Sequence, residues 1–331
     1  MVESSPYALE PDYFARYCDV HPPELRFQAK TQTEMQAWRQ ALQAKIRDLL
    51  CLSAYQSVPP NPRRVERVEE EAYWREKLVY ETAPGITAVA YLLTPKGESH
   101  PRPSLLCPPG HGPGKEAVIQ KGTIMDYGVR FAEEGYVTFV PEHLGFGERA
   151  QYYDGNSDRG YRLTNLKLQI LGLPVIGLRT WDLMRGLDLM AQLPEVDPKR
   201  IGCVGLSLGG EMTLYLAALD DRIKVAIISG FLNTFRDTFF AVEHCNCGYV
   251  PGILRYAEMG DIAALIAPRP LLIESGKRDR GFPTSGALEA WAIVRRAYDV
   301  AGVADRTDFE AFDGEHAFSG RKALPWVRKW L

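Results

Sequence analysis

The segment Gly205-Leu206-Ser207-Leu208-Gly209 constrains this chain more than any other. It follows a short apolar run at residues 200–204 and precedes a segment of helical character at residues 210–219. A strand, a Gly-x-Ser-x-Gly turn and a helix in this order are typical of a nucleophile elbow. In such a turn the serine has strained backbone angles, and the flanking glycines let strand and helix pass closely. We therefore predict that the Ser207 hydroxyl stands clear of the backbone at the end of a sheet.

Strand and helix patterns alternate on both sides of this turn. Short apolar and β-branched runs predict strands at residues 75–82, 86–94, 104–107, 136–140, 201–204, 225–229, 270–274 and 307–312. Apolar residues at helical spacing predict helices at residues 123–134, 177–193, 210–219, 285–300 and 321–331. The alternation predicts an α/β fold with a mostly parallel central sheet, right-handed crossovers and helices on both faces.

The N-terminal part of the chain follows a different pattern. The first 25 residues, rich in Pro, Tyr and acidic residues, are expected to form an irregular arm. Thr31-x-x-Glu34 is typical of a capping box, and the apolar residues that follow it recur at helical spacing: Met35, Trp38, Leu42, Ile46 and Leu49. We predict that residues 1–74 form an arm and a helix packed on a catalytic domain of residues 75–331. The helix is expected to close the core, and self-association into a homo-oligomer is the alternative.

A further segment, residues 231–260, interrupts the alternation of strands and helices. It lies between two predicted strands and carries its own aromatic and cysteine residues. An insertion near the carboxyl edge of such a sheet is a candidate cap over a site.

Composition restricts the classes of partner. The 331 residues carry a formal net charge of −3, without the basic footprint that nucleic-acid or phospholipid binding leaves. No apolar stretch reaches the ~20 residues that span a bilayer. The N-terminus has neither the basic nor the apolar region of a secretory signal. We predict a cytoplasmic protein with a small-molecule partner and without a cofactor, a nucleic acid or a membrane as partner.

A serine hydroxyl needs a base that removes its proton during attack, and that base needs an orienting carboxylate. In the chain order of an elbow, both follow the serine. Two histidines do so, and His316, directly after the last predicted strand, is favoured over His244 in the candidate cap. Asp279, in the loop after the strand at residues 270–274, is the favoured carboxylate. Its alternatives are Glu274, Glu243 and Asp237.

The oxyanion of a tetrahedral intermediate needs two N–H donors. One is expected to be the backbone N–H of Leu208, the residue after the serine. The other should come from the loop Pro108-Pro109-Gly110-His111-Gly112-Pro113-Gly114 after the strand at residues 104–107. The N–H of His111 is the favoured donor and that of Gly112 the alternative, because Pro113 has no N–H.

Together these segments resemble an α/β-hydrolase, and within that superfamily the serine carboxylesterases of the acetyl-xylan-esterase and dienelactone-hydrolase-like branches. Residues 109–112 stand in the place of the usual His-Gly oxyanion loop, although Pro109 occupies a position where these proteins often have His. The stretch 142–148 follows the next strand as in the family. The resemblance covers residues 75–331 and implies a serine hydrolase that forms an acyl-enzyme on short-chain, acetyl-type esters, with Ser207, His316 and Asp279 as its triad.

Three other functions stay open at the level of sequence. A peptidase or amidase would use the same triad, but such relatives usually carry a large N-terminal propeller, for which this chain has too few residues. A metal-dependent hydrolase could use Cys245 and Cys247 with His244, and a binding protein would use none of these residues. Cys-x-Cys without a second ligand pair is a weak motif, so no metal is predicted.

Overall fold

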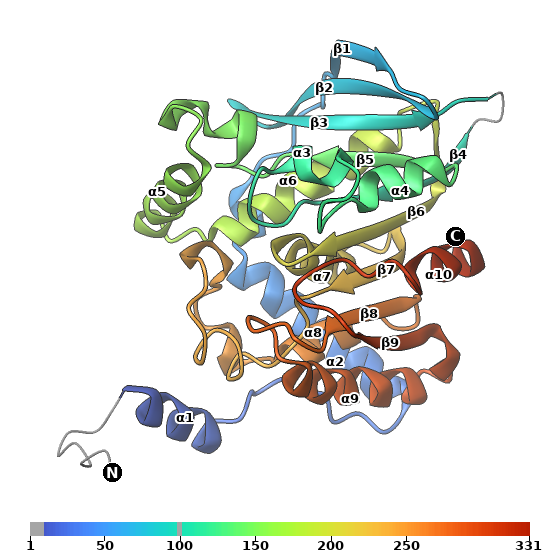
Figure 1. The fold of residues 1–331 in the computed structure, drawn as a ribbon. Coiled ribbons are helices and arrows are strands. Elements are labelled where there is room, and N and C mark those ends of the chain that lie inside the picture. Colours follow the sequence, from blue (N-terminus) through green and yellow to red (C-terminus); the bar gives the residue numbers. More distant parts are fainter. Residues whose placement is uncertain (1–9, 98–100) are drawn as a thin grey trace.

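Nine strands form one sheet in the computed structural model, which describes residues 10–97 and 101–331 (Figure 1). The strand order is β1-β2-β3-β5-β4-β6-β7-β8-β9. The strands are β1 Arg63–Glu69, β2 Tyr73–Ala83, β3 Ile86–Pro95, β4 Arg102–Leu106, β5 Val137–Pro141, β6 Val196–Leu206, β7 Ile223–Ser229, β8 Leu271–Gly276 and β9 Thr307–Phe312. Antiparallel pairing joins β1, β2, β3 and β5, and every pair from β5 to β9 along the sheet is parallel. The predicted α/β fold with a mostly parallel sheet is confirmed.

Helices cover both faces of the sheet (Figure 1). They are α1 Glu10–Val20, α2 Gln32–Leu49, α3 Lys115–Ile119, α4 Tyr127–Glu133, α5 Ser157–Ile170, α6 Val175–Met190, α7 Leu208–Leu219, α8 Met259–Ala264, α9 Thr284–Val300 and α10 Ala323–Trp330. Successive strand residues point to opposite faces. On β4, Leu106 therefore joins the core that contains α2, α6, α7, α8 and α9, whereas Leu105 joins the core beneath α4 and α10.

Helix α2 begins and docks as its sequence predicts. The capping box is formed, because Thr31 Oγ1 accepts from Glu34 N and a Glu34 carboxylate oxygen accepts from Thr31 N. Leu42 and Ile46 are fully buried in the same core as α7. Gln43 donates to the carbonyl of Ala218 at 2.7 Å, at the C-terminal end of α7. The helix thus completes one side of the main core, whereas self-association stays a prediction.

The structure corrects two expectations for the first 75 residues. Residues 10–20 form helix α1 instead of an irregular arm, and the ring of Phe14 stacks on Phe240 at 5.7 Å. Strand β1 was not predicted, because its sequence RRVERVE has six of seven residues exposed and hence no buried face to set a pattern. Edge strands are commonly charged in this way, since charge hinders pairing with other chains.

The candidate cap has little regular structure. Between β7 and α8 the chain forms two short 3-10 turns, at Asn246–Gly248 and Ile253–Arg255, and its remaining residues are loops and turns. Phe231, Phe235 and Val250 nevertheless belong to the main core. The segment is therefore packed on the domain along much of its length, and its role as a cap stays a prediction. Within the described residues no helix is long and apolar enough to cross a bilayer.

Candidate active site

Ser207 lies on a strained turn between β6 and α7. Its φ of 60° and ψ of −124° fall in a region that residues with a Cβ rarely adopt. Glycines surround the turn because there is no room for side chains: a Cβ on Gly205 would lie 2.2 Å from the carbonyl oxygen of Gly209. A Cβ on Gly209 would lie equally close to the carbonyl oxygen of Pro108. The strand–turn–helix arrangement predicted around Ser207 is present.

His316 and Asp279 are joined at the carboxyl edge of the sheet. Asp279 Oδ2 accepts from His316 Nδ1 at 2.6 Å. The other oxygen, Oδ1, accepts from the backbone N–H groups of Gly281 and Phe282 at 2.9 and 3.1 Å, and the side chain is only 2% exposed. The ring of Phe282 stacks on His316 at 5.6 Å. A buried carboxylate held in this way fixes the imidazole with Nδ1 protonated and leaves Nε2 as the basic nitrogen.

His316 lies over the end of β7, next to the strand that carries the serine. A Cβ on Gly230, directly after β7, would lie 3.2 Å from His316 Cε1 and 2.8 Å from Leu206 Cδ1. The backbone N–H of Ser207 donates to the carbonyl of Ser229 at 3.0 Å, which places the two strand ends side by side. Ser207 Oγ makes no hydrogen bond with the described residues. In free enzymes the bond between nucleophile and base is often long and shortens only with substrate.

The alternative residues have other partners. His244 packs between the rings of Phe239 and Phe282, and burial lowers its pKa. Glu274 accepts from the backbone N–H groups of Ser319 and Gly320, and Asp237 pairs with its neighbour Arg236. Glu243 is exposed. Of the four candidate carboxylates, all among the described residues, Asp279 is the one that accepts from His316, and His244 lies nearby on the ring of Phe282.

The loop after β4 crosses the turn of Ser207 at van der Waals distance. A Cβ on Gly110 would lie 3.4 Å from the Cβ of Ser207 and 2.9 Å from the carbonyl oxygen of Leu206. Buried side chains hold the loop: Tyr127 donates to the carbonyl of Pro108 at 2.6 Å, and His143 donates to that of Pro109 at 3.0 Å. Burial lowers the pKa of His143 well below its usual range, so the ring is neutral.

The N–H groups of His111 and Leu208 border the turn. His111 follows Gly110 in the loop, and Leu208 is the first residue of α7. The first N–H groups of a helix have no partner within the helix, and they carry the positive end of its dipole. The role of the His111 and Leu208 N–H groups as donors to an oxyanion stays a prediction.

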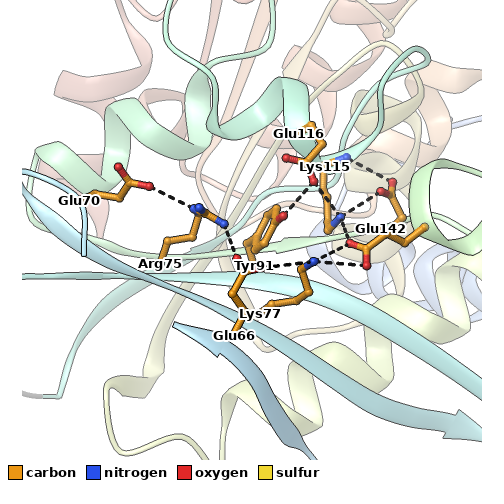
Figure 2. Close-up of polar contacts among 9 residues, drawn as sticks. Glu66, Glu70, Arg75, Lys77, Tyr91, Lys115, Glu116 and Glu142 are labelled. Carbon is orange, nitrogen blue, oxygen red and sulfur yellow. Dashed lines mark hydrogen bonds and ion pairs between the residues drawn. The ribbon is translucent and has the colours of Figure 1, made fainter. Parts of the chain in front are cut away.

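The far end of this loop is held by a buried carboxylate, Glu142, just after β5 (Figure 2). Its Oε1 accepts from the backbone N–H of Lys115, and its Oε2 lies 3.6 Å from Lys115 Nζ. Burial raises the pKa of Glu142 to about 7. A Cβ on Gly114 or on Gly147 would lie 2.1 Å from this carboxylate, so both glycines are needed for the approach.

Charged side chains continue outward from Lys115 across β2 and β3 (Figure 2). Lys115 Nζ also contacts Glu116 and Glu148, at 3.0 and 2.5 Å. Lys77 reaches Glu148 from β2, and Tyr91 donates from β3 to Glu116 at 2.9 Å. Sequence reasoning identified the stretch 142–148 only by resemblance, because the partners of Glu142 and Glu148 come from other elements.

The imidazole of His111 has a partner that the sequence did not indicate. His111 Nε2 and Cys247 Sγ are 3.0 Å apart, although 136 residues separate them. Cys245 Sγ donates to Cys247 Sγ at 2.8 Å. This hydrogen bond, together with the charge of Arg179 and the contact with His111, lowers the pKa of Cys247. The sequence grouped the two cysteines with His244, and that grouping is wrong: His111 takes its place.

A sheet of this order, with a serine on a strained strand–helix turn, defines an α/β-hydrolase. The chain matches the model of the Abhydrolase family over residues 17–323, and it belongs to that family. A relative described as "Putative hydrolase YtaP", from Bacillus subtilis, is 29% identical over 286 residues, which cover 81% of this chain and 91% of the relative.

Solved structures show the same fold. A "putative acetyl xylan esterase" from Bacteroides fragilis superposes with a TM-score of 0.83 at 20% identity, covering 99% of this chain and 96% of that one. A glucuronoyl esterase from Solibacter usitatus superposes with a TM-score of 0.65 at 15% identity, covering 99% of each chain. The predicted superfamily is confirmed, and the protein is a hydrolase.

Proposed function

We propose that the protein is a serine carboxylesterase that acts through an acyl-enzyme. The observation that carries this proposal is the pairing of His316 with a fully anchored Asp279, beside the strained turn of Ser207. Ser207 Oγ attacks the ester carbonyl while His316 Nε2 takes its proton. The alcohol leaves, and the acyl group stays on Ser207. Water then cleaves this acyl-enzyme, so that water is the one reagent besides the ester.

Each side chain then has one role in the reaction. Asp279 keeps the imidazole in the tautomer with a free Nε2 and stabilises the imidazolium that forms. His316 returns the proton to the leaving alcohol and later activates water for deacylation. The N–H groups of His111 and Leu208 bind the oxyanion, and each such donor contributes about 3 kcal/mol by mutational precedent.

The substrates we propose are esters with short acyl groups, of the acetyl type. Aromatic rings occupy the space beside the histidine: Phe282 stacks on His316, and His244 lies 4.9 Å from Phe282. The acetyl xylan esterase among the solved structures is named for the same kind of acyl group. Amide cleavage by the same triad is the alternative.

Covalent labelling tests the nucleophile. A fluorophosphonate should add once to the native protein, with the adduct on the peptide that contains Ser207. Ser207→Ala should abolish the label, whereas Ser285→Ala, which removes an exposed hydroxyl on α9, should keep it. Labelling that persists in Ser207→Ala would refute the assignment.

A substrate panel tests the specificity. The rate should be highest for acetyl esters and fall as the acyl chain lengthens, and acetyl esters should be cleaved faster than aminoacyl amides. A maximum at long chains, or faster amide cleavage, would overturn the proposed substrate class.

A further inference from the structure

Three side chains that bind metals meet beside the loop after β4. The Nε2 atom of His111 and the Sγ atoms of Cys245 and Cys247 all lie within 4.8 Å of one another. They come from two segments, since His111 belongs to the loop after β4 and the cysteines to the segment between β7 and α8. Convergence of a distant histidine on a Cys-x-Cys pair is more specific than the pair alone, because the fold has to bring the histidine there.

The two thiols do not pack as apolar side chains. Cys107 shows the ordinary case: it is fully buried in the core beneath α4, and its thiol makes only a weak contact with the carbonyl of Leu105. Cys247 is equally buried, yet its sulfur faces a thiol at 2.8 Å and an imidazole at 3.0 Å. These are the atoms of a donor set, two sulfurs and one nitrogen, that suits a thiophilic cation.

The geometry points to one zinc ion. We propose that His111, Cys245 and Cys247 bind Zn²⁺ as three protein ligands, with water as the fourth. Tetrahedral zinc with ligand bonds of about 2.0–2.3 Å separates its ligand atoms by somewhat under 4 Å. Cys247 Sγ lies 2.8 Å from Cys245 Sγ and 3.0 Å from His111 Nε2, so these atoms have to move apart by about 1 Å or less to hold the ion. His111 and Cys245 are half-buried, so solvent reaches the site from their side and Cys247 closes it from within.

Charge balance is compatible with a divalent ion. Each thiol releases its proton on binding, so Zn²⁺ with two thiolates and a neutral imidazole forms a neutral unit. Two buried groups lie nearby: Arg179, whose charge acts on both thiols, and Glu211, whose pKa is raised well above its usual range by burial, so that it adds no negative charge. Since proton release accompanies binding, the affinity for zinc should fall as the pH is lowered.

Such an ion would join the loop that borders Ser207 to the segment between β7 and α8. It would fix the ring of His111, whose N–H we assign to the oxyanion, and only this consequence rests on the proposed function. The ion itself takes no part in the attack by Ser207. The role proposed for zinc is structural: it holds the loop after β4 against the segment between β7 and α8.

Zinc analysis of the native protein tests the site. The reduced protein should hold about one zinc ion per chain, released when a mercurial blocks the thiols in the presence of a chromogenic chelator. Cobalt substitution should give thiolate-to-cobalt charge-transfer absorption, which requires sulfur ligands. Cys247→Ser and His111→Ala should lower the zinc content about tenfold or more, whereas Cys51→Ser, which changes a half-buried thiol after α2, should not.

The outcomes separate this proposal from the esterase proposal. Ser207→Ala should lose phosphonate labelling and keep its zinc. The zinc site is refuted if the reduced native protein takes up neither zinc nor cobalt. It is also refuted if the protein purified without reductant has an intact mass two hydrogens lower because Cys245 and Cys247 form a disulfide instead. If Cys247→Ser does not fold, the cobalt spectrum of the native protein decides alone.

Discussion

Asp279→Asn is the most direct test of how the site works. The carboxylate is held at one end by the N–H groups of Gly281 and Phe282, both on Oδ1, and at the other by His316 on Oδ2. In the amide, the carbonyl oxygen has to take the Oδ1 position, because an NH₂ group there would face two donors and leave each unpaired, at about 1–3 kcal/mol each. The NH₂ group then faces His316 Nδ1.

The size of the effect follows from this orientation. Because the amide donates, Nδ1 has to accept, and the imidazole proton moves to Nε2, the nitrogen that should take the proton of Ser207. A histidine in the wrong tautomer lowers kcat by about 10⁴ in a serine protease with the same pairing. This corresponds to about 5.5 kcal/mol in the activation barrier. The fold should change little, since the loop keeps both N–H bonds to the side chain.

The assay is steady-state hydrolysis of an aryl acetate, with thermal unfolding measured in parallel. Asp313→Asn is the matched control: this carboxylate lies three residues before His316, is 80% exposed and pairs with Arg278. Its loss should change kcat less than about twofold, because exposed ion pairs contribute little. If Asp279→Asn keeps more than a tenth of the native kcat, the role assigned to Asp279 is wrong.

Two other predictions concern the loop and the sheet edge. Gly110→Ala places a Cβ 2.8 Å from Met125 Sδ and 2.9 Å from the Leu206 carbonyl, so the loop should move away from Ser207. We expect kcat/KM to fall about 10²-fold with a loss of 1–3 kcal/mol, roughly, in unfolding free energy, and an unchanged kcat/KM would contradict the placement of the oxyanion donor. Burial raises the pKa of Glu274 from 4.5 to about 7, so this carboxyl stabilises the fold at acid pH and that contribution, about 3 kcal/mol, is lost as the pH rises through about 7. Denaturant unfolding at pH 5 and pH 8 measures this loss, and Glu274→Gln should lose less unfolding free energy between the two pH values than the native protein. Equal losses in the two proteins would refute the raised pKa. Glu243→Gln, at an exposed site, is the control.

The parts of the fold that sequence predicts are those that bury at least one face, such as β5 and β8, which are buried throughout. Strand β9 was predicted at its observed bounds, and α2 was located by its capping box and by Leu42 and Ile46. The turn of Ser207 can be predicted because strand, helix and loop approach one another so closely that glycines are required within a few residues of the serine. These glycines are visible in the sequence. Strand β1 was missed because exposure on both sides leaves no period to detect.

The candidate site also has residues that the sequence predicts and contacts that it does not. Asp279 and His316 could be named because chain order and strand ends restrict where an acid and a base can lie. The partners of His111 and of Glu142 could not, since Cys247 and Lys115 reach them only through the packing of separate elements. The local sequence around Cys245 favours its neighbour His244 as the third side chain and gives no sign of His111. A contact between distant residues depends on the whole topology and has no local pattern.

Helix α7 is supported from both of its ends. Its first residues carry the turn of Ser207, and its last carbonyls, those of Ala218 and Leu219, accept from Gln43 and Arg47 of α2. A cation at the C-terminus of a helix stabilises the helix dipole, and the other end of α7 carries the N–H of Leu208 that we propose as an oxyanion donor. Removal of α2 would therefore remove the partners of the last carbonyls of α7. An engineer who trims the N-terminal helix to obtain a smaller catalyst should expect to alter turnover as well as heat tolerance.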